Sequence, residues 1–240
     1  MRLTLHYALV VAALFPTVAS LAARNAAPAL SPPVTIDIGS RLELFVDDFL
    51  IERMDGTQLK LHEAQPAGIA LRFDRPWEGS FSGYLTVIKD EDRFRMYYRG
   101  LATAGKDGST NECTCYAESA DGIRWTKPDL GQFDLLGSRS NNIVLAHAAP
   151  FSHNFAPFLD TRPGIPSSEK FKALAGTSGS GLVAFASGNG LRWRKMRNAP
   201  VLTEGAFDSQ NVAFWSEVEQ CYVAYFRTWT SGEFQGFRTV

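Results

Sequence analysis

The sequence carries almost no excess of charge of either sign. Of its 240 residues, 24 are Lys or Arg and 25 are Asp or Glu, so the formal net charge is -1, and no stretch is rich in basic residues. Proteins that bind nucleic acid or an anionic membrane surface by charge carry a basic patch or stripe. The balanced charge therefore argues against both of these partners and favours a neutral ligand.

Cysteine is scarce, and no Cys-x-x-Cys or Cys/His spacing predicts a zinc site. No Asp-rich loop predicts calcium either, so we expect neither a metal nor a cofactor. Cys113 and Cys115 lie two residues apart in a strand-like stretch, which places both thiols on one face but does not let them bridge each other easily. A disulfide from Cys221 to either one stays open as an alternative, and buried free thiols are the favoured state.

Only one long apolar run is present, and it lies at the N-terminus. Arg2 precedes an apolar stretch over residues 7–19, and small residues follow over 20–23. This order is typical of a secretory signal peptide, and the run is short for a membrane span. We expect a signal peptide over residues 1–22, a flexible lead-in over 23–35, and export to the periplasm or the extracellular space without a remaining membrane segment.

Sustained helical spacing of apolar residues is absent from the rest of the chain. Short runs rich in β-branched and aromatic residues recur instead, separated by Gly, Pro, Asp and Asn. With 45% hydrophobic and 12% aromatic residues, the chain has enough apolar material for a buried core. The sequence therefore predicts an all-β protein. The expected strands cover residues 44–51, 84–88, 94–98, 113–118, 171–175, 182–187, 212–215 and 222–227.

These strands recur as a unit of about four, and the unit ends in the pattern Ser-x-(Asp/Asn)-Gly-x-x-Trp. The pattern occurs at residues 119–125 and again at 187–193. Asp or Asn followed by Gly predicts a turn between two strands, and the tryptophan is expected to fill the gap between adjacent sheets. Sheets that repeat in this way predict propeller blades, because each buries its faces against its neighbours. We place the blades at about 74–136, 141–202 and 205–240, the last one incomplete.

Three sequence features together indicate a resemblance to a known family. Residues 44–51 (Leu-Phe-Val-Asp-Asp-Phe-Leu-Ile), the pair 87–90 and 95–100 (Val-Ile-Lys-Asp and Arg-Met-Tyr-Tyr-Arg-Gly), and the two Gly-x-x-Trp turns resemble the five-bladed β-propeller glycosidases. This group comprises the invertase, levanase and arabinanase relatives and proteins similar to the N-terminal domain of glycosyl hydrolase family 32. The resemblance covers residues 36–240. It implies a five-bladed propeller of which about two and a half blades are present, as expected of a C-terminally truncated chain.

The resemblance also implies a site. The related glycosidases place carboxylates at the starts of the innermost strands of their first three blades, where one attacks or activates water and another protonates the leaving group. This sequence departs from them, since it lacks the Asn-Asp-Pro-Asn-Gly, Arg-Asp-Pro and Glu-Cys motifs. Asp160 follows its strand and is interpreted as a turn residue.

The candidate site residues come from the segments that precede the innermost strands. Asp208 is the expected catalytic acid and Glu78 the expected base or nucleophile. The alternative for Asp208 is a residue that caps a turn, and the alternative for Glu78 is an exposed loop carboxylate. Imidazole, amide and aromatic groups suit sugar hydroxyls and the apolar faces of sugar rings. Arginines at corresponding strand ends bind hydroxyls or a carboxylate, or pair with a loop acid. The expected substrate-binding residues are His153, Asn154, Gln210, Asn211, Trp77, Tyr84, Arg99 and Arg227.

Three functions remain open. The first is an exported glycosidase-like protein that hydrolyses or binds glycans in a propeller funnel. The second is a propeller that binds a glycan or another small ligand without turnover, and the third is a structural or protein-binding propeller. The sequence does not specify the sugar, the linkage or the stereochemical outcome. It does not specify the oligomeric state either.

Overall fold

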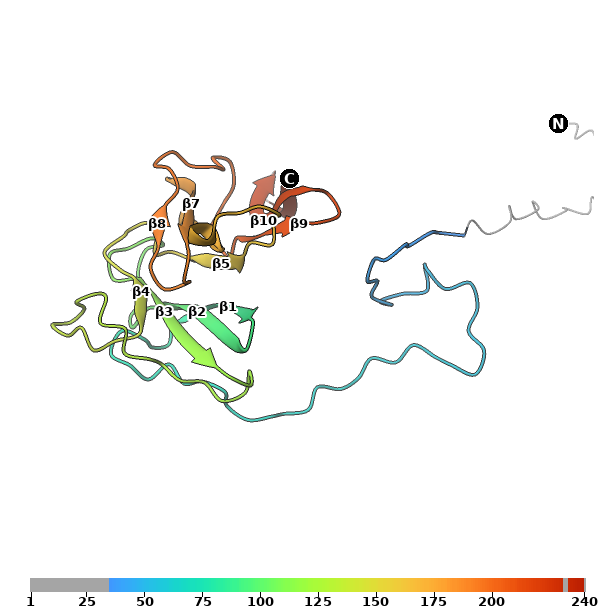
Figure 1. Ribbon diagram of the computed structural model, residues 1–240, viewed down its shortest axis with the longest axis horizontal. Coiled ribbons are helices and arrows are strands. Elements are labelled where there is room, and N and C mark those ends of the chain that lie inside the picture. The colour runs from blue at the N-terminus through green and yellow to red at the C-terminus, as the bar shows by residue number, and fades with distance from the viewer. Residues whose placement is uncertain (1–34, 231–232, 240) are drawn as a thin grey trace, which may run out of the picture. The chain divides into compact units, whose positions relative to one another are not determined.

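The computed structural model describes residues 35–230 and 233–239 (Figure 1). The chain divides into two units, Met1–Pro66 and Ala67–Val240. The predicted signal peptide (1–22) and the lead-in up to residue 34 lie outside the described residues. Among the described residues, none forms a helix long and apolar enough to span a membrane.

In the first unit, the described residues 35–66 form bends and turns but neither a helix nor a strand. The predicted strand at residues 44–51 is therefore wrong. Leu44 is 84% exposed and Val46 is 80% exposed, so the apolar side chains of this segment find no sheet to pack against. A strand needs a hydrogen-bonded neighbour, and the apolar pattern alone does not supply one.

The second unit is nearly all β, as the sequence predicts. It contains three antiparallel sheets, named sheets 1, 2 and 3, and a single 3₁₀ turn, η1 (Ser167–Glu169), in its described part. Sheets 1 and 2 have four strands each, and sheet 3 has three described strands. Sheet 1 is β1 (Gly83–Asp90), β2 (Arg93–Gly100), β3 (Cys113–Ser119) and β4 (Ile143–Leu145); sheet 2 is β5 (Ala156–Leu159), β6 (Phe171–Thr177), β7 (Gly181–Ser187) and β8 (Arg194–Lys195); sheet 3 is β9 (Val212–Ser216), β10 (Cys221–Thr230) and β11 (Glu233–Thr239).

The seven predicted strands from residue 84 onward are confirmed, with ends that differ by a few residues. One boundary differs more. Strand β4 pairs with β3 and so completes sheet 1, although we expected the first blade to end near residue 136. The reason is a long excursion, residues 120–142, that returns to the sheet edge before the chain leaves for sheet 2.

The first strand of each sheet lies next to the first strand of the following one, since β1 contacts β5 and β5 contacts β9. Each sheet then runs outward by antiparallel neighbours in chain order. Figure 1 shows sheets 1 and 2 as separate layers with their first strands close together. This arrangement is consistent with an incomplete propeller-like fold.

Registers and ion pairs establish which residues of sheets 1 and 2 are equivalent. Arg95 of β2 stands opposite Ile88, and its guanidinium bonds Asp90 at 2.8 Å. Lys172 of β6 stands opposite Phe158, and its ammonium bonds Asp160. In both sheets the acid at the end of the first strand therefore pairs with the base on the second. Asp160 is a hairpin residue, as its position after the strand predicts.

The two Gly-x-x-Trp turns have the same internal hydrogen bonds. The hydroxyl of Ser119 accepts hydrogen bonds from the backbone amides of Asp121 and Gly122. The hydroxyl of Ser187 accepts hydrogen bonds from the backbone amides of Asn189 and Gly190. The tryptophan indole then donates to the glycine carbonyl at 3.1 Å in both copies. Glycine is required at this position because the backbone φ is 75° at Gly122 and 71° at Gly190, in the left-handed region.

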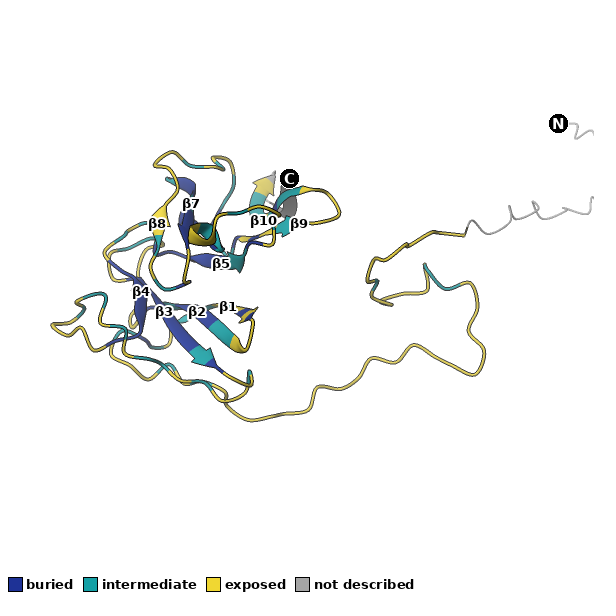
Figure 2. Ribbon diagram, viewed as in Figure 1, coloured by how far each residue is buried: buried dark blue, intermediate teal, exposed yellow. Residues whose placement is uncertain are grey.

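The core lies within and between the sheets, and Figure 2 shows it as buried strands surrounded by exposed loops. Tyr97, Tyr116 and Phe171 are fully buried in the seam between sheets 1 and 2. Trp193 enters the same seam, with its ring 6.1 Å from Tyr97 and 4.9 Å from Phe155. The predicted structural role of this tryptophan is confirmed.

The cysteines are free thiols. Cys113 and Cys115 are buried on one face of β3 with their Sγ atoms 3.7 Å apart, and burial raises the pKa of the Cys115 thiol. Cys221 lies on β10 in sheet 3. The three cysteines are therefore free thiols, as the favoured alternative predicts, although Cys221 is only partly buried.

Buried carboxylates make the stability of the second unit sensitive to acid. Burial alone would raise the pKa of Asp160, but hydrogen bonds from Lys172 and Tyr222 outweigh burial and lower this pKa. The pKa of Asp90 is lowered in the same way by its neighbours, Lys170 first among them. A carboxyl whose pKa is lower in the folded chain contributes stability above its unfolded value, about 3.9, and this contribution is lost as the pH falls through the folded value.

We therefore expect the free energy of unfolding to fall as the pH drops from about 5 to about 2. Urea unfolding at a series of pH values measures this, and Asp160→Asn, though less stable overall, should show a shallower fall. A free energy of unfolding that stays constant over this interval would rule out the contribution of these two carboxylates.

Candidate functional site

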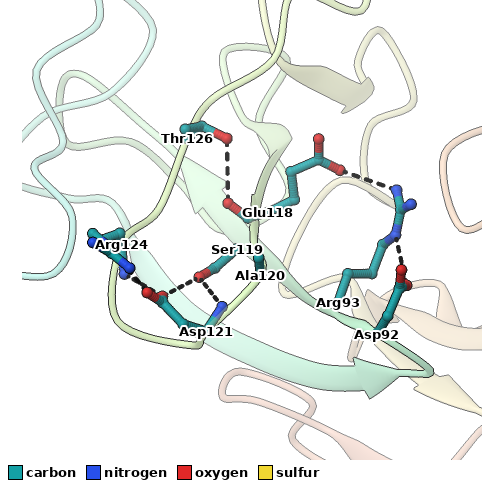
Figure 3. Close-up of a pocket in the computed structure, with 8 residues that line it drawn as sticks. All are labelled: Asp92, Arg93, Glu118, Ser119, Ala120, Asp121, Arg124 and Thr126. Atoms are coloured by element: carbon teal, nitrogen blue, oxygen red, sulfur yellow. Dashed lines mark hydrogen bonds and ion pairs between the residues drawn. The ribbon is translucent and has the colours of Figure 1, made fainter.

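A hollow of about 440 Å³ lies beside the first Gly-x-x-Trp turn (Figure 3). Its polar groups bond one another: Asp121 bonds Ser119 and Arg124, and Arg93 lies between Asp92 and Glu118. A hollow of about 480 Å³ lies beside the second turn. Because a hollow accompanies the turn in both copies, it follows from the geometry of the repeated turn and is not particular to a site.

Three predicted residues lie close to the starts of the first strands, although a register shift between Gly83 and Thr86 in β1 sets Gly83, and not Tyr84, opposite Arg99. Tyr84 precedes Thr86 by two residues, Asn154 precedes Ala156 by two, and Asn211 precedes Ala213 by two. Thr86 stands opposite Tyr97 of the second strand in sheet 1. In the same way, Ala156 stands opposite Leu174 in sheet 2, and Ala213 stands opposite Ala224 in sheet 3. Since the first strands are neighbours, this register puts all three predicted residues at one end of the array. We name this end of the first strands the inner-strand end.

The backbone at the inner-strand end is unusual. Tyr84 has a φ of 52°, Asn154 of 47° and Phe207, beside Asp208, of 49°. Non-glycine residues in the left-handed region cost about 1–3 kcal/mol and are concentrated at functional sites. Asn154 is 1% exposed and Asn211 is 1% exposed, and the side-chain oxygens of both have no hydrogen-bond partner among the described residues. A strained backbone and unpartnered buried polar groups both call for a reason beyond packing, so the inner-strand end is the candidate site.

A histidine is held between two carboxylates at the same end. His153 Nδ1 lies 3.0 Å from a carboxylate oxygen of Glu112, and Nε2 lies 3.8 Å from Oδ2 of Asp107. Asn154 Nδ2 lies 3.0 Å from Nε2. Since a carboxylate only accepts hydrogen bonds, Nδ1 donates to Glu112 and Nε2 accepts from the amide. His153 and Glu112 are buried, whereas the Asp107 side chain is 54% exposed.

Asp208 and Arg227 form an ion pair across the start of sheet 3. Arg227 Nε donates to Asp208 Oδ1 at 2.7 Å, and a second contact joins Nη2 to Oδ2. The hydrogen bond to Asp208 raises the pKa of the Arg227 guanidinium, and Tyr84 and Asp107 act in the same direction.

Two further predicted residues bond the inner-strand end together. Arg99 donates to the carbonyl of Phe81 at 2.8 Å and lies over the ring of Tyr84, 4.6 Å from its centroid. Gln210 Nε2 donates to the carbonyl of Leu85 at 3.0 Å and so ties the loop before sheet 3 to β1. Arg227 therefore forms the salt bridge to a loop acid that the sequence left open as an alternative. Arg99 instead donates to a backbone carbonyl.

Two predicted residues belong to the interior of sheet 1 instead. Glu78 has a fully buried side chain and accepts hydrogen bonds from Lys127 and Tyr98, both at 2.6 Å. Trp77 packs against the sheet 1 core and donates to Asn142 at 3.0 Å. The expected role of Glu78 as base or nucleophile is not supported, because its carboxylate is 0% exposed and paired with Lys127. Trp77 is only partly buried, and its expected role as a sugar platform stays a prediction.

Asp107 and Glu112 were not among the predicted residues. Both lie between the second and third strands of sheet 1, whereas the candidates were drawn only from the segments before first strands. Their one signal is the spacing of two acids around the turn at Gly108, which packs against Pro150 and Thr177 of the following repeat. That contact brings the loop to His153, and it cannot be derived from spacing alone.

Asp107, Glu112 and His153 offer ligand atoms that all lie within 4.8 Å of one another, so they are the described residues that could hold a metal ion. Both ring nitrogens of His153 are already engaged by Glu112 and Asn154. We therefore assign no metal to this group.

No family model matches the sequence, and no curated protein sequence matches it. Among solved structures, a protein named "Glycoside hydrolase" aligns with a TM-score of 0.40 and 11% identity over 65% of this chain. A second, named as a complex of BT0996 and RGII, aligns with a TM-score of 0.38 and 12% identity over 61% of this chain. The chain spans about half of each, 51% and 48%. Similarity at this level carries no argument about function.

Proposed function

We propose that the protein binds a carbohydrate at the inner-strand end. The observation that carries the proposal is the placement of Tyr84, Asn154 and Asn211 at the starts of three neighbouring strands, beside the ion pair of Asp208 and Arg227. A neutral, hydroxyl-rich ligand fits the balanced charge of the chain. The predicted export would bring such a site to periplasmic or extracellular glycans.

The chemistry of these side chains suits sugar hydroxyls, which both donate and accept hydrogen bonds. Amides offer both functions, the Asp208 carboxylate accepts, and the Arg227 guanidinium donates in a fixed plane. The Tyr84 ring offers an apolar face, with Arg99 stacked on one side. Binding sites of this kind combine a few oriented polar groups with aromatic surface.

Hydrolysis of a glycosidic bond is a second candidate, favoured by two carboxylates that remain partly exposed. Asp107 and Asp208 are 54% and 32% exposed at their side chains, and Asp208 is paired with Arg227. Glycosidases use two carboxyl groups about 5 to 9.5 Å apart, one to protonate the leaving oxygen and one to attack or to activate water. In this proposal Asp208, held in an ion pair, is the nucleophile or base rather than the acid, and Asp107 takes the place expected of Glu78.

A glycan array followed by a glycosidase screen tests both candidates. We expect Asp208→Asn to weaken binding of the best glycan at least tenfold and to lower any hydrolysis at least a hundredfold, because the carboxylate is lost while the side-chain shape is kept. Asp134→Asn, an exposed carboxylate in the excursion of sheet 1, is the control and should change neither. Wild-type binding or turnover by Asp208→Asn would refute the assignment, and binding without turnover would select the non-catalytic function.

A further inference from the structure

The segment that precedes β1 presents charged side chains that the inner-strand end does not use. Leu71 and Phe73 pack against the core of sheet 1, whereas the residues between and after them, Arg72 and Asp74, are exposed. Arg75 is exposed as well. Packing of the two apolar side chains therefore leaves the charged ones on the outside of sheet 1.

The buried pair of Glu78 and Lys127 holds the backbone of both arginines. The Lys127 ammonium donates to the carbonyl of Arg72 at 2.5 Å, and the Glu78 carboxylate accepts the backbone amide of Arg75 at 3.1 Å. The amide of Glu78 donates in turn to the carbonyl of Arg75 at 2.9 Å. Both arginines are therefore carried on a backbone that is anchored to buried groups, which positions them before any ligand binds.

A hollow of about 360 Å³ lies over this segment, and we name it the arginine hollow. Its volume is within the range of about 300 to 1,000 Å³ found for ligand sites. The polar and aromatic residues that line it are Arg72, Asp74, Arg75, Trp125 and Lys127. A smaller hollow of about 80 Å³ shares Arg75 and Lys127 with it and is also lined by Trp77. One partly buried tryptophan therefore lies on each side of Arg75 and Lys127.

The acids of the arginine hollow are already paired, and its arginines are not. Lys127 bonds Asp74 at 3.0 Å and Glu78 at 2.6 Å, and the hydrogen bond from Lys127 lowers the pKa of Asp74. Among the described residues, the guanidiniums of Arg72 and Arg75 have neither a hydrogen-bond nor an ion-pair partner. Two cationic groups with their donors are therefore directed to a ligand and not to a neighbouring acid.

We propose that the arginine hollow binds an acidic sugar, a uronate unit of a glycan. A guanidinium presents paired donors in one plane and binds a carboxylate through two parallel hydrogen bonds. The indole rings of Trp77 and Trp125 add apolar surface, which suits the face of a sugar ring better than an extended acidic peptide. The arginine hollow shares no residue with the inner-strand end, so this proposal does not depend on the carbohydrate site there.

Isothermal titration of the full chain with a hexamer of galacturonate tests the proposal. We expect saturable binding, and at least tenfold weaker binding of the methyl-esterified hexamer, because the ester removes the charge and keeps the sugar. The double variant Arg72→Gln/Arg75→Gln should bind the hexamer at least tenfold more weakly than the wild type. Arg139→Gln/Arg192→Gln is the matched control, because it removes the same charge from two other exposed arginines, and should bind as the wild type does.

Hydrogen exchange of the wild-type protein gives a readout that does not depend on any variant folding. The bound hexamer should protect amides in residues 69–77 and 125–129 and leave residues 151–156 and 205–212 unchanged. Absence of binding, equal binding of the acid and its ester, full binding by the double variant, or protection confined to other segments would overturn the proposal. A hexaglutamate peptide that binds as tightly as the hexamer would also overturn it, since the hollow would then accept a carboxylate without a sugar.

Discussion

Replacing Lys127 with methionine should lower the free energy of unfolding by about 3–5 kcal/mol. The Lys127 side chain is 8% exposed and its ammonium bonds Glu78, whose side chain is 0% exposed, at 2.6 Å. Removing the cation leaves the carboxylate buried without its charged partner, and a buried unpaired charge is among the costliest defects a mutation can create. Urea unfolding followed by far-ultraviolet circular dichroism measures the change.

Arg124→Met is the control for this prediction, because it also removes a cation from an ion pair with a carboxylate. The Arg124 side chain is 89% exposed, and its partner is Asp121 at 2.8 Å. Exposed pairs contribute about 0–1 kcal/mol. A loss of similar size in both variants would contradict the assignment of Glu78 and Lys127 as a buried structural pair and would reopen Glu78 as a site residue.

Replacing Trp193 with alanine should cost about 3 kcal/mol, the lower end of the range for a core aromatic, because the ring is only partly buried. The indole contacts Tyr97 of sheet 1 and Phe155 at the start of sheet 2, so its removal opens the seam between the two sheets. The same unfolding experiment measures the loss, and increased hydrogen exchange in β2 and β5 would locate it.

Trp193→Phe separates the two contributions of this side chain. It keeps a ring in the seam but removes the hydrogen bond from the indole to the Gly190 carbonyl. We expect it to cost clearly less than Trp193→Ala. An alanine variant as stable as the wild type would mean that the sheets are held together elsewhere.

The sequence predicted the strands of the second unit well because their apolar patterns are bounded by turn residues that also recur. It failed at residues 44–51, where the pattern is equally apolar but Leu44 and Val46 stay exposed. A strand forms only when another strand is placed beside it, and this long-range condition is not written in a local pattern.

The same distinction separates the site residues. The repeat located the starts of the first strands, and so it placed Tyr84, Asn154 and Asn211 near these starts, while their role in binding stays a prediction. It could not show that Glu78 turns inward to Lys127, since a loop position does not specify which way a side chain points. It also could not find Asp107, whose loop reaches His153 only through tertiary contacts.

Hydrogen exchange of the wild-type protein, with and without the glycan that binds most strongly on an array, tests the carbohydrate site most directly. We expect the glycan to protect amides at the inner-strand end, in residues 81–86, 105–113, 151–156 and 205–212. Protection confined to the hollow beside the first turn or to the strands of sheet 2 away from these segments, with these segments unchanged, would contradict a carbohydrate site at the inner-strand end.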